Sequence, residues 1–220
     1  RRNMVGPITT PRANRVGAVH DSGDFAAALD AALARADAPG FTVRRADTEA
    51  RGLLRGLGIA AYVHPTAGGG YEMEQARLRV HPTGTATLFV GTHSHGQGHA
   101  TVYAQLVAAR LGLPIEAIDV AFGDTGRDPW GRGTYGSRYL SIAGPAALAA
   151  VDKVIAKGRR IAAHLLEASV ADIEFANGAF TVRGTDRAVS FGQVALTAYV
   201  PHNFPHESLE PGLDELAAYA

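Results

Sequence analysis

Two segments of the chain share one order: a short apolar run, a glycine-rich stretch and then helical periodicity. The first begins with the apolar run 85–93 and continues, past closely spaced glycines, into 100–112, where apolar residues recur at helical spacing. The second begins with 115–126 and passes through the glycine-rich stretch 128–140 into the alanine-rich segment 141–168. Each order predicts a strand, a loop and a helix, which favours a fold that packs helices on a sheet.

Two helices and a strand are expected near the N-terminus. The first helix is expected over 21–37, with Asp21 and Ser22 as candidate capping residues. Its apolar residues recur at every fourth position: Phe25, Leu29 and Leu33. A shorter helix is expected over 48–58, and the apolar and β-branched run at 59–65 predicts a strand.

Two hairpins and a last helix complete the expected elements. The runs within 71–93 surround a turn at Pro82–Gly84 and predict the first hairpin. Asn177-Gly178 lies between two alternating runs within 172–184, which is the strongest local hairpin signal in the chain. A short helix is expected over 191–200. Together the elements predict an α/β (α+β) fold, a mixed β-sheet with hairpins and packed helices.

The two ends of the chain have weaker patterns than its middle. We expect an extended N-terminal segment at 1–20, the folded domain at 21–200 and an extended, proline-bearing C-terminal segment at 201–220. The chain begins without an initiator methionine, and its last segment shows no closing element. We therefore expect a piece of a longer polypeptide.

Charge and cysteine content narrow the possible partners. The 21 Lys and Arg residues balance 21 Asp and Glu residues, so we expect no nucleic acid and no anionic membrane as partner, but small molecules or proteins. The chain has no cysteine, which excludes disulfides, thiolate metal sites and thiol nucleophiles and fits a cytoplasmic location. We expect no membrane span, because no run of apolar residues approaches the necessary length.

The stretch VGTHSHGQGHATVYAQL at 90–106 has three histidines, and one interpretation is a metal site. His93, His95 and His99 form an H-x-H-x3-H pattern, and imidazole is a common ligand of zinc and related ions. The stretch contains no acidic residue. The hypothesis therefore requires the three rings to converge.

Two other interpretations use the glycines of the same stretch. A glycine loop between a strand and a helix leaves backbone N–H groups open and places the positive end of the helix dipole beside an anion. Gly96 and Gly98 would permit close approach, and the Gln97 amide could bind a planar heterocycle. The remaining interpretation is an ordinary strand-to-helix turn with surface histidines.

A family resemblance rests on the two glycine-rich segments taken together. They read GQGHATVYAQLVAARLGLPIEAIDVAFGDT at 96–125 and GRGTYGSRYLSIAGPAALAA at 131–150. In these motifs the chain resembles the large, molybdenum-binding subunits of the xanthine dehydrogenase and aerobic carbon monoxide dehydrogenase family, with the carbon monoxide dehydrogenase branch as the closer match. The stretches 19–37 and 209–220 resemble the same family, so the likeness covers most of the chain.

The resemblance implies that the two segments hold a molybdopterin cofactor. The implied cofactor-binding residues are Gly96, Gln97, Gly98, His99, Thr134, Tyr135, Gly136, Ser137 and Arg138. From their chemistry alone, Arg132 and Arg138 could either neutralise a pyrophosphate or be solvated surface residues. Tyr139 stands where many relatives carry a small hydroxyl residue.

The resemblance also implies a reaction and partner subunits. The full enzyme would carry out a two-electron oxidation of a small-molecule substrate at molybdenum, with the cofactor in its cytosine dinucleotide form. An iron–sulfur subunit and a flavin subunit would carry the electrons away. The family's catalytic glutamate lies in a later motif, so we assign no catalytic residue and no metal ligand here and expect the isolated chain to be inactive. A histidine-based metal-binding module and a non-catalytic assembly domain stay open as alternatives.

A few further polar residues have open or no assignments. Asp124 either orders a turn or contacts the cofactor, and Trp130 either anchors packing or stacks on the ligand. Glu72 and Glu74 would share one face of a strand, but nothing in the sequence positions them as an acid and a base, so they have no predicted role.

Overall fold

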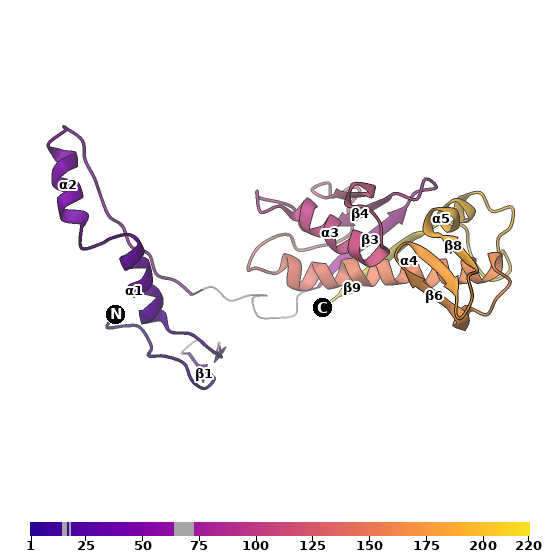
Figure 1. Ribbon diagram of the computed structural model, residues 1–220, viewed down its shortest axis with the longest axis horizontal. Coiled ribbons are helices and arrows are strands. Elements are labelled where there is room, and N and C mark those ends of the chain that lie inside the picture. Colours follow the sequence, from indigo (N-terminus) through magenta and orange to yellow (C-terminus); the bar gives the residue numbers. More distant parts are fainter. Residues whose placement is uncertain (15–16, 18, 64–72) are drawn as a thin grey trace. The chain divides into compact units, whose positions relative to one another are not determined.

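A computed structural model describes residues 1–14, 17, 19–63 and 73–220, and contacts divide the chain into a unit of residues 1–63 and a unit of residues 64–220. The α-helices are α1 (Phe25–Arg35), α2 (Phe41–Glu49), α3 (His99–Leu111), α4 (Gly144–Leu165) and α5 (Phe191–Tyr199) (Figure 1). The strands are β1 (Arg12–Ala13), β2 (Val19–His20), β3 (Glu74–Val80), β4 (Ala86–Val90), β5 (Ile118–Ala121), β6 (Ile173–Ala176), β7 (Ala179–Val182), β8 (Ala188–Ser190) and β9 (Asp214–Tyr219). Short helical turns are η1 (Ile115–Ala117), η2 (Tyr139–Ala143), which is a π-helix, and η3 (Val170–Asp172).

The first helix forms as predicted but begins at a different cap. α1 begins at Phe25, and the Asp24 carboxylate accepts a 2.9 Å hydrogen bond from the backbone N–H of Ala27. This bond satisfies one of the N–H groups that a helix N-terminus leaves open. The predicted caps, Asp21 and Ser22, are therefore wrong.

The second helix lies earlier in the chain than predicted. α2 occupies Phe41–Glu49, directly after Pro39-Gly40, whereas the apolar pattern predicted a helix over 48–58. The leucines of that pattern do not turn inward, and Leu54 is 94% exposed. No strand forms over 59–63, and residues 64–65 of the predicted strand lie outside the described residues. Gly52 has φ 74°, and the N–H of Leu53 donates a hydrogen bond to the carbonyl of Thr48, so a glycine helix end stops α2 inside the predicted range.

The second unit is built on a four-stranded mixed sheet in the order β5-β4-β3-β9. β3 and β4 form the predicted antiparallel hairpin, although residues 71–72 of its first run lie outside the described part of the chain. β5 pairs with β4 in parallel, which requires the crossover that α3 provides. β9 pairs antiparallel with β3, so the segment expected as an extended tail supplies an edge strand of this sheet.

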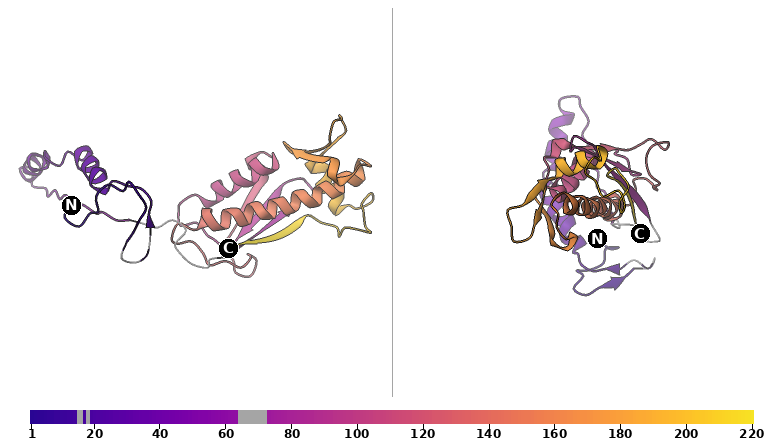
Figure 2. Two further views of the ribbon diagram at one scale, coloured as in Figure 1. Left: turned by 90° about the horizontal axis from the view of Figure 1, so that it is seen from below. Right: turned by 90° about the vertical axis from the view of Figure 1, so that its right-hand side faces the viewer.

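Two helices cover the inward face of the sheet. Burial alternates along β3, so that Glu74, Ala76, Leu78 and Val80 all point inward. α4 contacts β3 and β9, and α3 contacts both β5 and α4, as Figure 2 shows. Tyr139–Leu165 is long and apolar enough by composition to cross a membrane. In this fold its apolar face packs in the core, which accounts for that composition.

A three-stranded sheet, β6-β7-β8, packs against the C-terminal half of α4. The predicted turn is confirmed: Asn177 and Gly178 both have positive φ, 49° and 72°. Phe180 of β7 reaches α4 at Gly158, where an added Cβ would lie 2.6 Å from the phenyl Cζ. β8 was not foreseen in the sequence, because three residues are too few for a pattern.

Charged side chains on the outward face of β3 hold its neighbouring strand β9. Arg77 donates a 2.6 Å hydrogen bond to the Asp214 carboxylate, and Arg79 donates one of 2.9 Å. Partial burial alone would raise the pKa of Asp214, but the hydrogen bonds from both arginines outweigh it and lower this pKa. The edge strand is thus held by charge as well as by backbone pairing.

Candidate functional site

Two loops leave the same edge of the four-stranded sheet. β4 and β5 are parallel neighbours, so their carboxyl ends lie side by side, which is where open α/β sheets bind ligands. The first loop, residues 91–98, connects β4 to α3, and the second loop, residues 122–138, connects β5 to η2 and α4. Every residue of the predicted cofactor set lies in these loops or directly at the start of α3.

The first loop leaves the N-terminus of α3 open. Gly98 is the N-cap of α3 with φ 78°, and Gly96 has φ 109°; no described atom lies within 4 Å of where a Cβ would stand on either. Gly98 has no side chain to cap the helix, so the first N–H groups of a 13-residue helix face the loop. Glycine is required here because other residues are strained at positive φ.

Gln97 uses its carbonyl oxygen within the loop. That oxygen accepts a short hydrogen bond from the backbone N–H of His95 and a weaker one, 3.5 Å, from the hydroxyl of Ser94. The side chain is exposed, and the NH2 group is the part of the amide that remains for a ligand. The glutamine therefore also fixes the shape of the loop that carries it.

The three histidines of the first loop do not form one set of ligands. The Nε2 atoms of His93 and His95 are 2.8 Å apart. His99 is fully buried and stacks on the ring of Tyr139, with 3.7 Å between ring centres. Within the described ranges there is no group of three His, Asp or Glu side chains that could hold a metal ion. The convergence that the metal hypothesis required is absent.

Both ring nitrogens of His99 are buried without a hydrogen-bond partner among the described residues. Burial lowers the pKa of His99, and the nearby His95 and His93 lower it further. The neutral imidazole is therefore favoured, with one N–H to donate and one nitrogen to accept. A buried polar ring in this condition costs free energy unless a ligand or water satisfies it.

The second loop is joined to the first by direct contacts. The hydroxyl of Thr134 donates a 2.7 Å hydrogen bond to the carbonyl of His93. Gly91 and Gly131 bring the two backbones together, because a Cβ on Gly91 would lie 2.5 Å from the Cα of Gly131. Thr134, one of the predicted residues, thus connects the loops in addition to any contact with a ligand.

The remaining predicted residues of the second loop fall into two groups. Gly136 and Ser137 both have φ 56°; Tyr135 is 47% exposed and Ser137 is also exposed, whereas Gly136 is half-buried. Arg138 is only 1% exposed and lies under the Tyr135 ring, with its guanidinium carbon 5.2 Å from the ring centre. Arg138 is therefore neither the solvated surface residue nor the open anion ligand that its sequence allowed.

Arg138 pairs with Glu74, which sequence reasoning had left without a role. The Arg138 guanidinium donates a short hydrogen bond to the Glu74 carboxylate, and both side chains have 0% exposure. The alternation of β3 could have predicted that Glu74 is buried, because Glu74 lies on the same inward face as Ala76 and Leu78. A carboxylate at a core position needs a partner, and the sequence did not show which arginine would supply it.

A polar layer continues from this pair beneath both loops. The phenol of Tyr103 on α3 lies 2.7 Å from the hydroxyl of Thr92 and donates a 3.2 Å hydrogen bond to the carbonyl of Tyr139. Burial raises the pKa of Tyr103, so it stays a neutral donor. Tyr139 begins the π-helix η2, a rare geometry that often occurs at functional sites.

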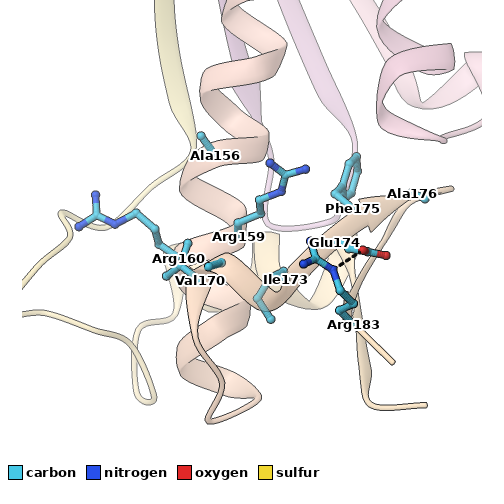
Figure 3. Close-up of a pocket in the computed structure, with 10 residues that line it drawn as sticks. Ala156, Arg159, Arg160, Val170, Ile173, Glu174, Phe175, Ala176 and Arg183 are labelled. Carbon is cyan, nitrogen blue, oxygen red and sulfur yellow. Dashed lines mark hydrogen bonds and ion pairs between the residues drawn. The ribbon is translucent and has the colours of Figure 1, made fainter. Parts of the chain in front are cut away.

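The cavities on this unit include one at the loops and one away from them. One of about 550 Å³ adjoins the loops and is lined by Gly91, His93, Gly123, Asp124, Thr125, Asp128, Pro129, Trp130 and Gly131. In it, Asp124 accepts a 2.9 Å hydrogen bond from the N–H of Gly126, the turn-ordering role considered for it. The other, about 820 Å³, lies between α4 and β6, where Arg183 pairs with Glu174 at 2.7 Å, and it contains no residue of the predicted set (Figure 3).

Comparisons with known proteins show the family of the chain. Residues 31–220 match the family model described as the molybdopterin cofactor-binding domain. The chain is 36% identical to the carbon monoxide dehydrogenase large chain of Hydrogenophaga pseudoflava, covering 99% of this chain and 28% of that protein. It is 33% identical to the nicotine 6-hydroxylase large subunit of Paenarthrobacter nicotinovorans, covering 100% of this chain and 28% of that one.

A solved structure gives the same result for the fold. The carbon monoxide dehydrogenase of Oligotropha carboxidovorans matches with a TM-score of 0.69 and 34% identity, over 99% of this chain and 29% of its own. The chain thus spans less than a third of the length of the relatives it matches.

Proposed function

We propose a cofactor-holding role for the two loops, on the premise that this chain belongs to the molybdopterin cofactor-binding domain family and to a large subunit of the carbon monoxide dehydrogenase type. One observation carries the proposal. The loops are hydrogen-bonded to each other at the carboxyl edge of the sheet, beside a helix N-terminus that no side chain caps. Such an edge suits an extended ligand with a phosphate at one end.

The residues present fit such a group. The space over Gly96 and Gly98 admits a phosphate close to the α3 backbone, and the positive helix end favours it. The Gln97 NH2 group and the loop surface at Ser137 can hydrogen-bond the polar edge of a pterin. His99 offers a buried donor and acceptor that have no hydrogen-bond partner among the described residues. A molybdenum-bearing pterin would supply two-electron redox chemistry when bound, while this chain supplies position and hydrogen bonds.

The finer points of the proposal follow from the same family. We propose that the cofactor carries the cytosine dinucleotide extension, and that the whole protein is the large subunit of a cytoplasmic oxidoreductase. Iron–sulfur and flavin subunits are its proposed electron-carrying partners. The substrate class stays at small molecules, because the two named relatives differ widely, one being a carbon monoxide dehydrogenase and the other a nicotine hydroxylase. The chain alone is proposed to be inactive, since no catalytic base is assigned to it.

Thermal unfolding of this chain with cytidine diphosphate tests the proposal, with cytidine as the control that lacks phosphates. A ligand that binds only the folded state at about 100 times its Kd stabilises by about 2.7 kcal/mol. For a protein of this size the melting temperature rises by about 5–11 °C. No saturable rise with cytidine diphosphate contradicts the proposal.

Two alanine variants locate the binding. Gly98→Ala places a Cβ in the space beside α3, whereas Gly184→Ala places one at nearly the same φ, 74° against 78°, in equally open space away from the loops. Both carry the strain of positive φ, about 1–2 kcal/mol. Only Gly98→Ala is expected to weaken cytidine diphosphate binding, and equal effects of both variants count against the site.

A parallel titration with Zn²⁺ in chelator-treated buffer tests the metal-binding alternative. A rise with zinc alone that His95→Ala removes supports the histidine module. No rise with either probe favours a non-catalytic assembly domain.

A further inference from the structure

A charge pair with no exposure lies beneath the second loop, and the cofactor-holding role does not explain it. Glu74 begins β3, and Arg138 immediately precedes η2, 64 residues later. Removing both charges from water costs more than a surface pair returns, so a buried pair is a poor device for stability alone. Its geometry indicates what else it does.

One carboxylate oxygen of Glu74 holds both ends of the second loop's last segment. Oε1 accepts a 2.8 Å hydrogen bond from the backbone N–H of Arg132 and a short one from Nη1 of Arg138. The same Nη1 donates at 2.8 Å to the carbonyl of Gly133, between those ends. Residues 132–138 therefore close on a single anchor in β3.

The start of β3 adds two backbone contacts to this anchor. Nη2 of Arg138 donates at 3.3 Å to the carbonyl of Met73, and the N–H of Gln75 donates at 3.2 Å to the carbonyl of Trp130. The second loop is thus fixed from Trp130 to Arg138 on a rigid strand. A binding loop held this way is already ordered in the free protein, so ligand binding does not have to supply the conformational entropy cost of ordering it.

The two arginines of the segment differ in their surroundings. Arg138 is buried and its guanidinium is occupied by Glu74, Gly133 and Met73. Arg132 is exposed, and the described residues offer its guanidinium no ion pair, while its backbone N–H is held by Glu74. The same anchor that occupies one arginine therefore fixes the position of the other.

We infer that the Glu74–Arg138 pair is a positioning device that sets the second loop in its ligand-binding conformation, and that Arg132 is the arginine that binds the phosphates of the ligand. This division rests on the proposed cofactor-holding role. Glu74 and Arg138 do not touch the ligand; they act through the loop.

The single tryptophan, Trp130, reports on the loop without any ligand, because it is 53% exposed and lies at the held end. Iodide quenching of its fluorescence measures how far the loop departs from its place. Glu74→Leu leaves a buried, unpaired guanidinium and is expected to lower the melting temperature strongly. The double variant Glu74→Leu/Arg138→Met removes both charges and is expected to regain most of that loss.

The double variant separates positioning from stability. The inference expects its melting temperature near that of the wild type, but stronger iodide quenching of Trp130 and weaker cytidine diphosphate binding. If the loop is in its binding conformation only about a tenth of the time, the measured Kd rises about tenfold. Wild-type quenching and affinity in a double variant with restored stability would overturn the positioning role.

Arg132→Ala tests the second half of the inference. It is expected to raise the Kd for cytidine diphosphate and to make binding less dependent on salt, because a charge contact is lost. Arg183→Ala is the matched control, since it removes an exposed arginine paired with Glu174 outside the loops. Equal binding by Arg132→Ala and the wild type overturns the assignment of Arg132.

Failure of the inference and failure of the proposed function give different results. A wild-type chain that does not bind cytidine diphosphate refutes the cofactor-holding role. The quenching comparison between the wild type and the double variant still decides whether the Glu74–Arg138 pair orders the loop.

Discussion

Replacing Gly91 by alanine puts a methyl group where the end of β4 touches the second loop. The new Cβ would lie 2.5 Å from the Cα of Gly131 and 2.9 Å from its nitrogen, whereas ordinary van der Waals contact begins at 3.4 Å. Both obstacles are backbone atoms, so no side-chain rotation relieves the collision. The two loops must move apart by roughly 1 Å, or their backbones must distort locally to give the same displacement.

The expected cost of Gly91→Ala is that of overpacking a tight contact, about 1–3 kcal/mol of unfolding free energy. For a protein of this size the melting temperature falls by about 2–12 °C, measurable by circular dichroism. Because Trp130 adjoins Gly131, its fluorescence is expected to change in the folded state as well. The separation also acts on the loop that the proposed function places against the ligand.

The control is Gly192→Ala in α5, where no described atom lies within 4 Å of the added Cβ. That change is expected to stabilise the helix by about 0.5–1 kcal/mol. A Gly91→Ala variant that melts with the wild type and keeps the same Trp130 spectrum would refute the close contact between the loops, and with it this account of the site.

Three further changes test the polar layer and the charged edge. Tyr103→Phe leaves the buried hydroxyl of Thr92 without its 2.7 Å partner, and the urea midpoint is expected to fall by the equivalent of about 1–3 kcal/mol. Burial, and then the two neighbouring histidines, lower the pKa of His99, so below pH 6.5 the unfolded chain binds a proton that the native state does not. The free energy of unfolding therefore decreases as the pH is lowered through this range. His99→Gln is expected to flatten this slope in urea titrations. Burial would raise the pKa of Asp214, but the arginine hydrogen bonds lower it, so the carboxylate stabilises the fold above pH 3.8 and this stabilisation is lost as the pH falls further. Asp214→Asn is expected to be less stable at neutral pH and to lose less unfolding free energy on acidification. Parallel acid curves of the variant and the wild type contradict this.

Local sequence patterns were sufficient for several elements. The step of the apolar residues predicted α3, and Gly112 ends this helix with φ 65° at its C-cap. Asn177-Gly178 predicted its hairpin because both residues tolerate positive φ. The two glycine-rich segments pointed to the two loops, since a strand that ends in glycines before a helix constrains the chain within a few residues.

Other elements depended on neighbours that are distant in the sequence. The apolar run at 48–63 has the composition of a helix and a strand, but α2 ends at Glu49 and no strand forms over 59–63. The last residues showed no closing element on their own, yet 214–219 become β9 because β3 offers them a free edge and two arginines.

The candidate site divides in the same way. The sequence alone determined which residues lie in the loops, because glycines and hydroxyl residues act within their own turns. Only the tertiary structure decided that His99 stacks on Tyr139 and lies apart from the other two histidines. It also decided that Arg138 points inward to Glu74 while Arg132 stays exposed. The physical reason is that a charged side chain can be buried only where an oppositely charged partner meets it. The partner of Arg138 lies 64 residues away in the sequence, so no local sequence pattern predicts the pair.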